Sequence, residues 1–218
     1  SDREKKIRFL AAEDAVRAYD ELAQDFDRET PPKLGGTKAK KIPSVKRKLI
    51  DACQRYIDIV GNSGERIVEI RYKMARIYYT YNHFDEASPA FDSIVRDHPE
   101  HDVACYAANL ALDISNGRQD YKSLRSLSRS YMANKKLQAS CRKNSGEEDI
   151  ERFSAIEAKA TFYMIKKDYE DAGKFIKAGN AYLKFHKEYS QQKGRESVAI
   201  DAVYNAALNF DRAQKLKR

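Results

Sequence analysis

Few residues in this chain of 218 have the type and spacing of a chemical site. His98 and His101 stand three positions apart, and imidazole nitrogens are common zinc ligands. A zinc site takes three or four protein ligands, however, and no third ligand follows at a usual spacing. The pair is more typical of a loop before a helix, and His83 and His186 are isolated. The sequence therefore predicts no metal site.

Glu147, Glu148 and Asp149 form an acidic run, and two carboxylates close together could act as a catalytic pair. It is better explained as the first turn of a long helix, where negative charge interacts favourably with the helix dipole. The sequence has no phosphate-binding glycine loop, no nucleophile elbow and no zinc signature. We predict a protein that is not an enzyme and that has no cofactor.

A basic segment between residues 38 and 48 contains six cations: Lys38, Lys40, Lys41, Lys46, Arg47 and Lys48. The chain has 41 basic and 33 acidic residues, a net charge of +8, and the excess is most visible in this segment. Such a loop could bind phosphates, lipid headgroups or an acidic protein. A solvated loop has the same composition, so both interpretations stay open. We do not expect nucleic acid as the main partner.

The element that organises the chain is a predicted helical hairpin over residues 70–99. Met74, Ala75 and Tyr78 share one helix face, and Ala87, Phe91 and Ile94 share one face of the next helix. The residues between the two helices form no long loop, so the helices must fold back on each other. A proline at position 99 ends the second helix.

This hairpin resembles the tetratricopeptide repeat, a helix-turn-helix unit of about 34 residues. The residues that match are Tyr78, Phe84, Ala87, Phe91 and Pro99, whereas the expected Trp and Gly are Arg71 and Ala75. The resemblance implies an all-α fold, an α-solenoid of stacked antiparallel helix hairpins with a right-handed twist. In that family the first helices of the hairpins line the concave wall.

A first hairpin is expected at about residues 4–60, with its turn lengthened by the Pro- and Gly-containing segment 30–36. Ser44 is the expected N-cap of its second helix, which runs to about residue 60. The residues expected on the apolar faces are Phe9, Val16, Tyr19, Leu22 and Phe26 in the first helix, and Ala52, Tyr56 and Ile59 in the second.

Further units are expected at residues 65–98, 102–132 and 147–189, with a basic helix and a loop at 143–146 before the last of these. Residues 196–218 are expected to form an incomplete unit. Because the units follow one another along the whole chain, we expect residues 1–218 to be one repeat domain.

The register of the unit at 147–189 has two alternatives. The preferred one places Gly173 in the turn, and Ala178, Tyr182 and Phe185 then repeat the four-then-three spacing. The other places the turn at residues 169–172 and Gly173 inside a helix.

The last helix has no partner helix after it. Its expected buried face holds Val203, Ala206, Ala207 and Phe210, with Leu208 and Phe210 partly exposed. We expect this open face to be covered by residues of a longer protein, of which this chain would be a piece, or by another chain, which leaves self-association open.

When the units are aligned by their turns, four tyrosines occupy equivalent positions: Tyr72, Tyr106, Tyr163 and Tyr204. The family resemblance implies that these positions face the concave groove. The predicted partner-binding residues are Tyr72, Arg76, Tyr79, Tyr106, Tyr163, Lys167 and Tyr204, with Asp113 beside them. Tyrosine has a large apolar face and a polar tip, which suits a peptide groove. Packing of each ring on the neighbouring hairpin is the alternative.

The family's best-known site grips a C-terminal carboxylate with Lys and Asn side chains. The equivalent positions hold Lys73, Ala107, Ile165 or Lys166, and Asn205, so a chaperone-tail receptor is not expected. We predict instead a scaffold that binds a peptide or helix of another protein. The alternatives are an anionic-surface binder and an accessory domain of an enzyme that lies outside this chain.

The segments 72–99 and 182–210 also resemble repeats of bacterial cell-envelope proteins, such as the barrel-assembly lipoprotein, the Tol–Pal-associated coordinator and gliding components. This resemblance implies the periplasm, near the outer membrane, with the cytoplasm as the alternative. No apolar run reaches the ~18 residues of a membrane span. Cys53 and Cys105 are expected as buried thiols, but a Cys105–Cys141 disulfide stays open.

Overall fold

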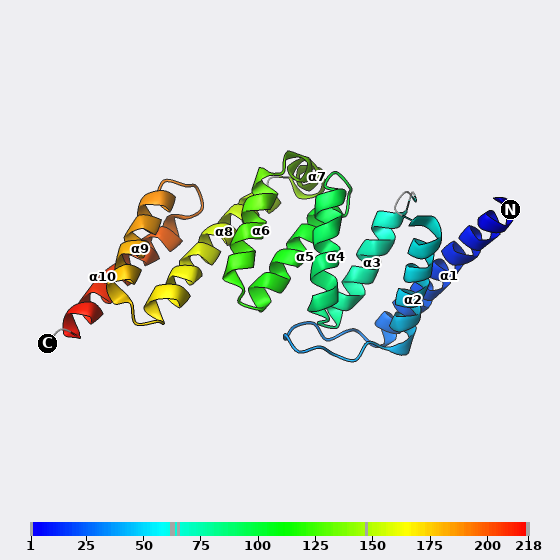
Figure 1. Cartoon of the computed structure of the whole chain (residues 1–218), viewed down its shortest axis with the longest axis horizontal. Helices are drawn as coiled ribbons and strands as arrows, with labels where there is room; N and C mark the ends of the chain where they lie inside the picture. Colours follow the sequence, from blue (N-terminus) through cyan, green and yellow to red (C-terminus); the bar gives the residue numbers. More distant parts are fainter. Residues whose placement is uncertain (1, 62–63, 65, 147, 217–218) are drawn as a thin grey trace. The chain divides into compact units, whose positions relative to one another are not determined.

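The computed structural model describes residues 2–61, 64, 66–146 and 148–216, and within these ranges it contains helices and no strand. The all-α prediction is confirmed. The helices, labelled in Figure 1, are α1 (Asp2–Glu29), α2 (Ser44–Val60), α3 (Ile67–Thr80), α4 (Phe84–Asp97), α5 (Ala104–Gly117), α6 (Tyr121–Ala133), α7 (Lys135–Ser145), α8 (Glu148–Ile165), α9 (Phe175–Tyr189) and α10 (Glu196–Lys215). A π-helical turn, Lys166–Glu170, continues α8.

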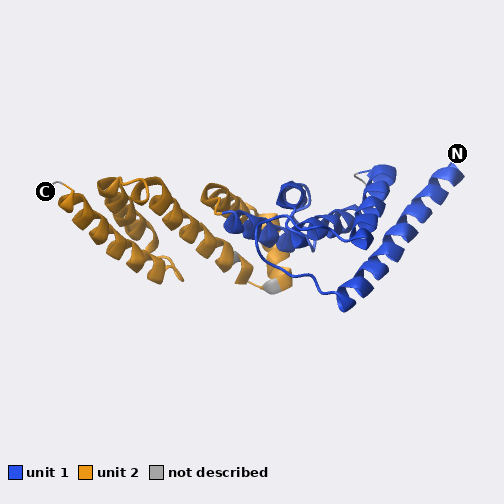
Figure 2. Cartoon of the chain, turned by 90° about the horizontal axis from the view of Figure 1, so that it is seen from below, with its two compact units in different colours: residues 1–118 blue, residues 119–218 orange. Residues whose placement is uncertain are grey.

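The chain divides into two compact units, Ser1–Arg118 and Gln119–Arg218 (Figure 2). In unit 1 each helix from α1 to α5 packs against the next one along the chain, as in an α-solenoid. In unit 2, α8 packs against α6, α7 and α9, and α9 packs against α10. The predicted hairpin at 102–132 falls across this division, since α5 belongs to unit 1 and α6 to unit 2.

The central hairpin of unit 1 consists of α3 and α4, joined by residues 81–83. Asn82 takes the left-handed conformation that this tight turn requires, with φ of 61°. Ala75, Ala87 and Phe91 are completely buried, so the two helices approach each other at alanines, with the Phe91 ring beside them. The predicted hairpin and the buried face of α4 are confirmed, but on the predicted face of α3 only Ala75 is buried, and Met74 and Tyr78 are partly exposed.

The first hairpin differs in detail from the prediction. Ser44 is the first residue of α2 and not its N-cap, since Pro43 occupies the cap position and makes no side-chain capping hydrogen bond. Leu22 and Ile59 are exposed, at 53% and 45% of their surfaces. The buried residues of the two helices include the small Ala12, Ala23, Ala52 and Cys53, and also Tyr56, whose ring lies 5.8 Å from the Phe9 ring.

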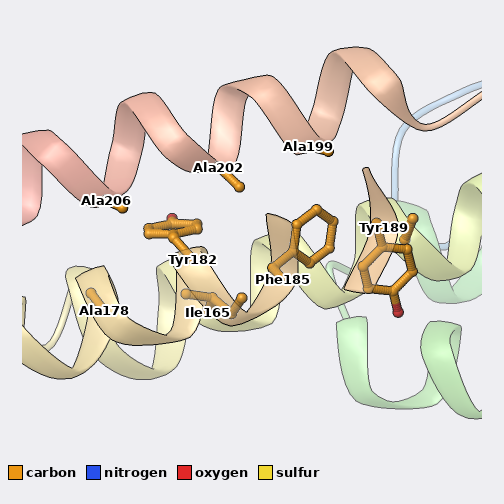
Figure 3. Close-up of a cluster of buried hydrophobic side chains, with 9 residues drawn as sticks. Ile165, Ala178, Tyr182, Phe185, Tyr189, Ala199, Ala202 and Ala206 are labelled. Atoms are coloured by element: carbon orange, nitrogen blue, oxygen red, sulfur yellow. The ribbon is translucent and has the colours of Figure 1, made fainter. Parts of the chain in front are cut away.

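The core of unit 2 joins α8, α9 and α10, as Figure 3 shows. Tyr182 and Phe185 of α9 point between the alanines of α10 and Ile165 of α8. Gly173 lies in the turn before α9 with φ of 69°, which confirms the preferred register and contradicts the other one.

The observed end of α7, first turn of α8 and exposed residues of α10 can be compared with the predictions for unit 2. The predicted loop 143–146 is wrong, because α7 continues to Ser145 and ends where Gly146 turns to φ of 67°. Glu148 and Asp149 do lie in the first turn of α8, whereas Glu147 is outside the described residues. In α10, Val203 and Ala207 are exposed.

The buried face of α10 is rotated by one residue from the predicted one. Ala199, Ala202, Ala206 and Asn209 are buried, and the Asn209 amide nitrogen donates to the Asn205 carbonyl at 2.8 Å. Phe210 and Leu208 are partly exposed, as predicted. The Phe210 ring lies against Gly179 of α9, whose missing side chain leaves room for it.

Gly179→Ala should therefore destabilise the protein, although alanine normally favours a helix over glycine. A Cβ at Gly179 would lie 2.6 Å from Cε1 of Phe210, so we expect a loss of about 1–3 kcal/mol in the free energy of unfolding, measured in urea. Phe210→Leu in the same chain should recover part of this loss. Gly117→Ala is the matched control, because its Cβ would meet nothing within 4 Å. A stabilising Gly179→Ala, or strict additivity with Phe210→Leu, would contradict the packing.

Cys53 should give the protein a specific sensitivity to alkali. Burial raises the pKa of this free thiol from 9.0 to about 12. Between these values the unfolded chain loses the thiol proton and the folded chain keeps it, so stability falls by about 1.4 kcal/mol per pH unit as pH rises. The free energy of unfolding should drop more steeply from pH 9 to 11 in the parent than in Cys53→Ala. Equal slopes for the two proteins would rule out a buried neutral thiol.

Candidate functional site

The largest groove described in unit 1 lies between α1 and α3, beside the loop that joins α1 to α2. Its volume is about 590 Å³, and we name it the α1–α3 groove. Both helices are the first helices of their predicted hairpins, which the family resemblance predicts to line the partner-binding wall. The residues that matter below are Asp20, Asp27, Glu69, Tyr72, Lys73 and Arg76.

Two cations at this groove are held by carboxylates of α1. The Lys46 ammonium group is buried and donates to Asp27 Oδ2 at 2.5 Å and to the Ala23 carbonyl at 3.0 Å. Lys73 donates to Asp20 Oδ2 at 2.7 Å. Each pair links α1 to the next elements of the unit, so these charges hold the groove in shape and are already neutralised.

Two carboxylate oxygens at the groove remain unsatisfied. Asp27 Oδ1 and Glu69 Oε2 are buried and accept no hydrogen bond from any described residue. The other oxygen of Glu69 lies 3.3 Å from Nε2 of His101. A buried acceptor without a donor costs free energy, so small local movements that admit an N–H group to these oxygens would be favourable.

Tyr72 and Arg76 form the distinctive feature of the groove. The half-buried Tyr72 ring packs on Phe91, with 6.0 Å between the ring centroids, and the Arg76 guanidinium lies over the Tyr72 ring at 5.9 Å. Burial raises the pKa of the Tyr72 hydroxyl. Arg76 is exposed and makes no salt bridge within the described part of the chain. Its charge is therefore available to a ligand.

The other predicted groove residues occupy different environments. Tyr79 packs on Phe84 and Phe91 and lines a second cavity, of about 280 Å³, together with Asp113. Tyr106 is 53% exposed in α5. Tyr79 thus packs within its own hairpin, whereas the Tyr106 ring is largely exposed.

The remaining members of the predicted tyrosine row belong to unit 2. Tyr163 stacks on Tyr121, with ring centroids 5.0 Å apart and an angle of 17° between the rings. Tyr204 is 65% exposed in α10, and Lys167 is exposed in the π-helical turn. A continuous row through both units stays a prediction.

The basic segment 38–48 is partly used inside unit 1. Lys40 donates through Nζ to the carbonyls of Lys33 and Gly35, and its backbone N–H donates to the Tyr81 carbonyl. The prediction of Lys46 as a surface cation is wrong, since it is buried in its pair with Asp27. The cations that do face solvent are Lys38, Lys41, Arg47 and Lys48.

Sequence reasoning missed how this segment is anchored. The Asn82 side-chain amide donates to the carbonyls of Gly35 and Lys38, and Nε2 of His83 lies 2.8 Å from the Lys40 carbonyl. The loop is therefore fixed to the α3–α4 turn. The signal in the sequence is an Asn-His pair in the short segment between two predicted helices.

The positions of the carboxylate clamp are occupied by groups with other roles. Lys73 is paired with Asp20, Ala107 and Ile165 are buried, and the Asn205 amide donates to the Asp201 carbonyl at 2.7 Å.

None of the helices within the described ranges is both long and apolar enough to span a membrane. In comparisons with known proteins, no family model, no curated protein and no solved structure matches this chain.

Proposed function

We propose that this chain is a non-catalytic interaction scaffold that binds an extended peptide or a helix of a partner protein in the α1–α3 groove. The observation that carries this proposal is the exposed Arg76 guanidinium over the half-buried Tyr72 ring, beside cations that are already paired. Arginine and tyrosine are the side chains most often found at the energetic centre of protein interfaces. A guanidinium without a salt bridge favours a carboxylate on the partner.

The groove also contains acceptors that the backbone of a peptide could use. Asp27 and Glu69 each have a buried oxygen that accepts no hydrogen bond, and after a small local movement the N–H groups of an extended segment could donate to these oxygens. The partner segment would then combine free backbone donors with an acidic side chain opposite Arg76.

The tetratricopeptide family is part of the same proposal. It is supported by the three-residue turn between two helices of 14 residues each, and by buried Ala87 and Phe91 at the signature positions. The likeness of segments 72–99 and 182–210 to bacterial envelope repeats supports a place in a periplasmic assembly, motility or secretion complex near the outer membrane. The cytoplasm is the alternative.

The groove can be tested with peptides selected from a random display library on the full chain. We expect Tyr72→Ala and Arg76→Ala each to weaken the selected peptide about tenfold or more, measured by isothermal titration, because truncating an interface centre costs ~2 kcal/mol. Arg47→Ala removes another exposed arginine of unit 1 and should change nothing. Tyr106→Ala/Tyr163→Ala shows whether the peptide follows the tyrosines further. Equal affinity of the parent and the Tyr72→Ala/Arg76→Ala protein would refute the proposal.

The cellular place can be tested with the same variants as bait. A protein from a bacterial envelope extract should bind the parent and not the folded Tyr72→Ala/Arg76→Ala variant, and a cytosolic extract should give no such protein. Groove-dependent capture from the cytosolic extract alone would show that the envelope assignment is wrong.

A further inference from the structure

The net positive charge of this chain belongs to one of its two units. Residues 1–118 contain 20 Lys and Arg and 20 Asp and Glu, whereas residues 119–218 contain 21 and 13. The whole excess of +8 therefore belongs to unit 2. The basic segment 38–48 lies in the unit with no net charge, so the attraction of this chain for anions should come from elsewhere.

Within unit 2, α9 has one buried face and one exposed face of different character. Its buried face, with Ala178, Tyr182 and Phe185, is directed at α10 and α8 in Figure 3. Residues on the opposite side of the helix are Ile176, Lys177, Leu183, Lys184 and Lys187, all of them exposed. We call these five residues the α9 outer face.

The lysines of the α9 outer face are not neutralised by neighbours. Glu188 is the one acidic residue in the sequence of α9, and it follows the last of them. Among the described residues, Lys177, Lys184 and Lys187 make no salt bridge, in contrast to Lys46 and Lys73 at the groove of unit 1. Their charges are available to an external anion.

Two large apolar side chains accompany these lysines. Ile176 and Leu183 are seven residues apart and expose 48% and 44% of their surfaces. Two turns of helix separate them, so they lie on the same side of α9 as each other. Each is followed directly by a lysine, Lys177 or Lys184, so the lysines lie beside them. Apolar groups flanked by lysines are typical of helices that lie in the interface of an anionic bilayer.

We propose that the α9 outer face binds the surface of an anionic phospholipid bilayer, independently of the groove in unit 1. The helix would lie parallel to the surface, with its three lysines at the lipid phosphates and with Ile176 and Leu183 between the headgroups. Each lysine near such a surface contributes to the attraction, and the two apolar side chains leave water.

The chemistry of this face favours lipid over a nucleic acid. Nucleic-acid sites use arginine for bidentate contacts and aromatic rings for base stacking. The α9 outer face contains lysine alone among the cations and no aromatic residue, and the nearby Phe175 ring is covered by Arg212 at 5.9 Å. Nucleic acid also offers no apolar layer for Ile176 and Leu183.

The experiment is co-sedimentation of the full chain with phosphatidylcholine vesicles, prepared with and without phosphatidylglycerol. The parent should bind the vesicles that contain phosphatidylglycerol and should not bind vesicles of phosphatidylcholine only. Lys177→Gln/Lys184→Gln/Lys187→Gln should weaken binding about 100-fold, roughly fivefold for each lysine. Ile176→Ser/Leu183→Ser should weaken it without a change in charge. The matched control Lys38→Gln/Lys41→Gln/Lys48→Gln removes the same charge from unit 1 and should bind as the parent does.

Three results would overturn the proposal. The first is that the parent does not bind phosphatidylglycerol vesicles, and the second is that the α9 and the control triple variants weaken binding equally. The third is that Ile176→Ser/Leu183→Ser leaves vesicle binding intact while duplex DNA competes for the site. Circular dichroism and urea unfolding establish that each variant is folded. Peptide binding in the groove should be unchanged in the α9 variants, so failure here and failure of the groove proposal can be told apart.

Discussion

Close approach of helices at small side chains is the constraint on which both units depend. In unit 1 the helices α3 and α4 meet at Ala75 and Ala87, and in unit 2 the aromatic rings of α9 fit against the alanines of α10. Each helix can then bury one face completely and leave the other to solvent. The groove and the α9 outer face are both consequences, since each consists of side chains that this packing does not use.

One buried carboxylate supplies the polar counterpart of this packing in unit 2. Glu157 of α8 is 5% exposed and accepts hydrogen bonds from Arg129 at 2.8 Å, Arg125 at 3.3 Å and the Tyr189 hydroxyl at 2.7 Å. It thereby joins α6 and α9 to α8. A charged group can be buried in this way because several donors compensate its lost hydration, which also fixes which side chains of α6 and α9 face inward. Neither Glu157 nor its partners formed a recognisable pattern in the sequence, since they lie up to 32 residues apart.

The sequence predicted the helices well and their rotation less well. Strong aromatic and alanine spacing identified the α3–α4 hairpin and the register of α9, because side-chain volume there leaves one arrangement that fits. The helical spacing predicts Leu22, Ile59 and Val203 on the buried faces, but alanines of the same helices are buried and these three larger side chains are exposed. At the groove, Tyr72 and Arg76 could be predicted from their helical positions. The pairing of Lys46 with Asp27 could not, because it depends on how a long loop returns to α1.

A cluster of cations in the sequence indicates a binding surface only if those cations are not paired inside the structure. The segment 38–48 has the densest run of cations in the sequence, yet Lys40 and Lys46 serve the structure of a unit that is neutral as a whole. The lysines of α9 are sparser along the chain, but the helix gathers them on one side with two apolar residues. A shaped groove with one available arginine can select a particular peptide, whereas a lysine face with apolar side chains recognises a surface. The two proposed sites therefore differ in the kind of specificity that their chemistry permits.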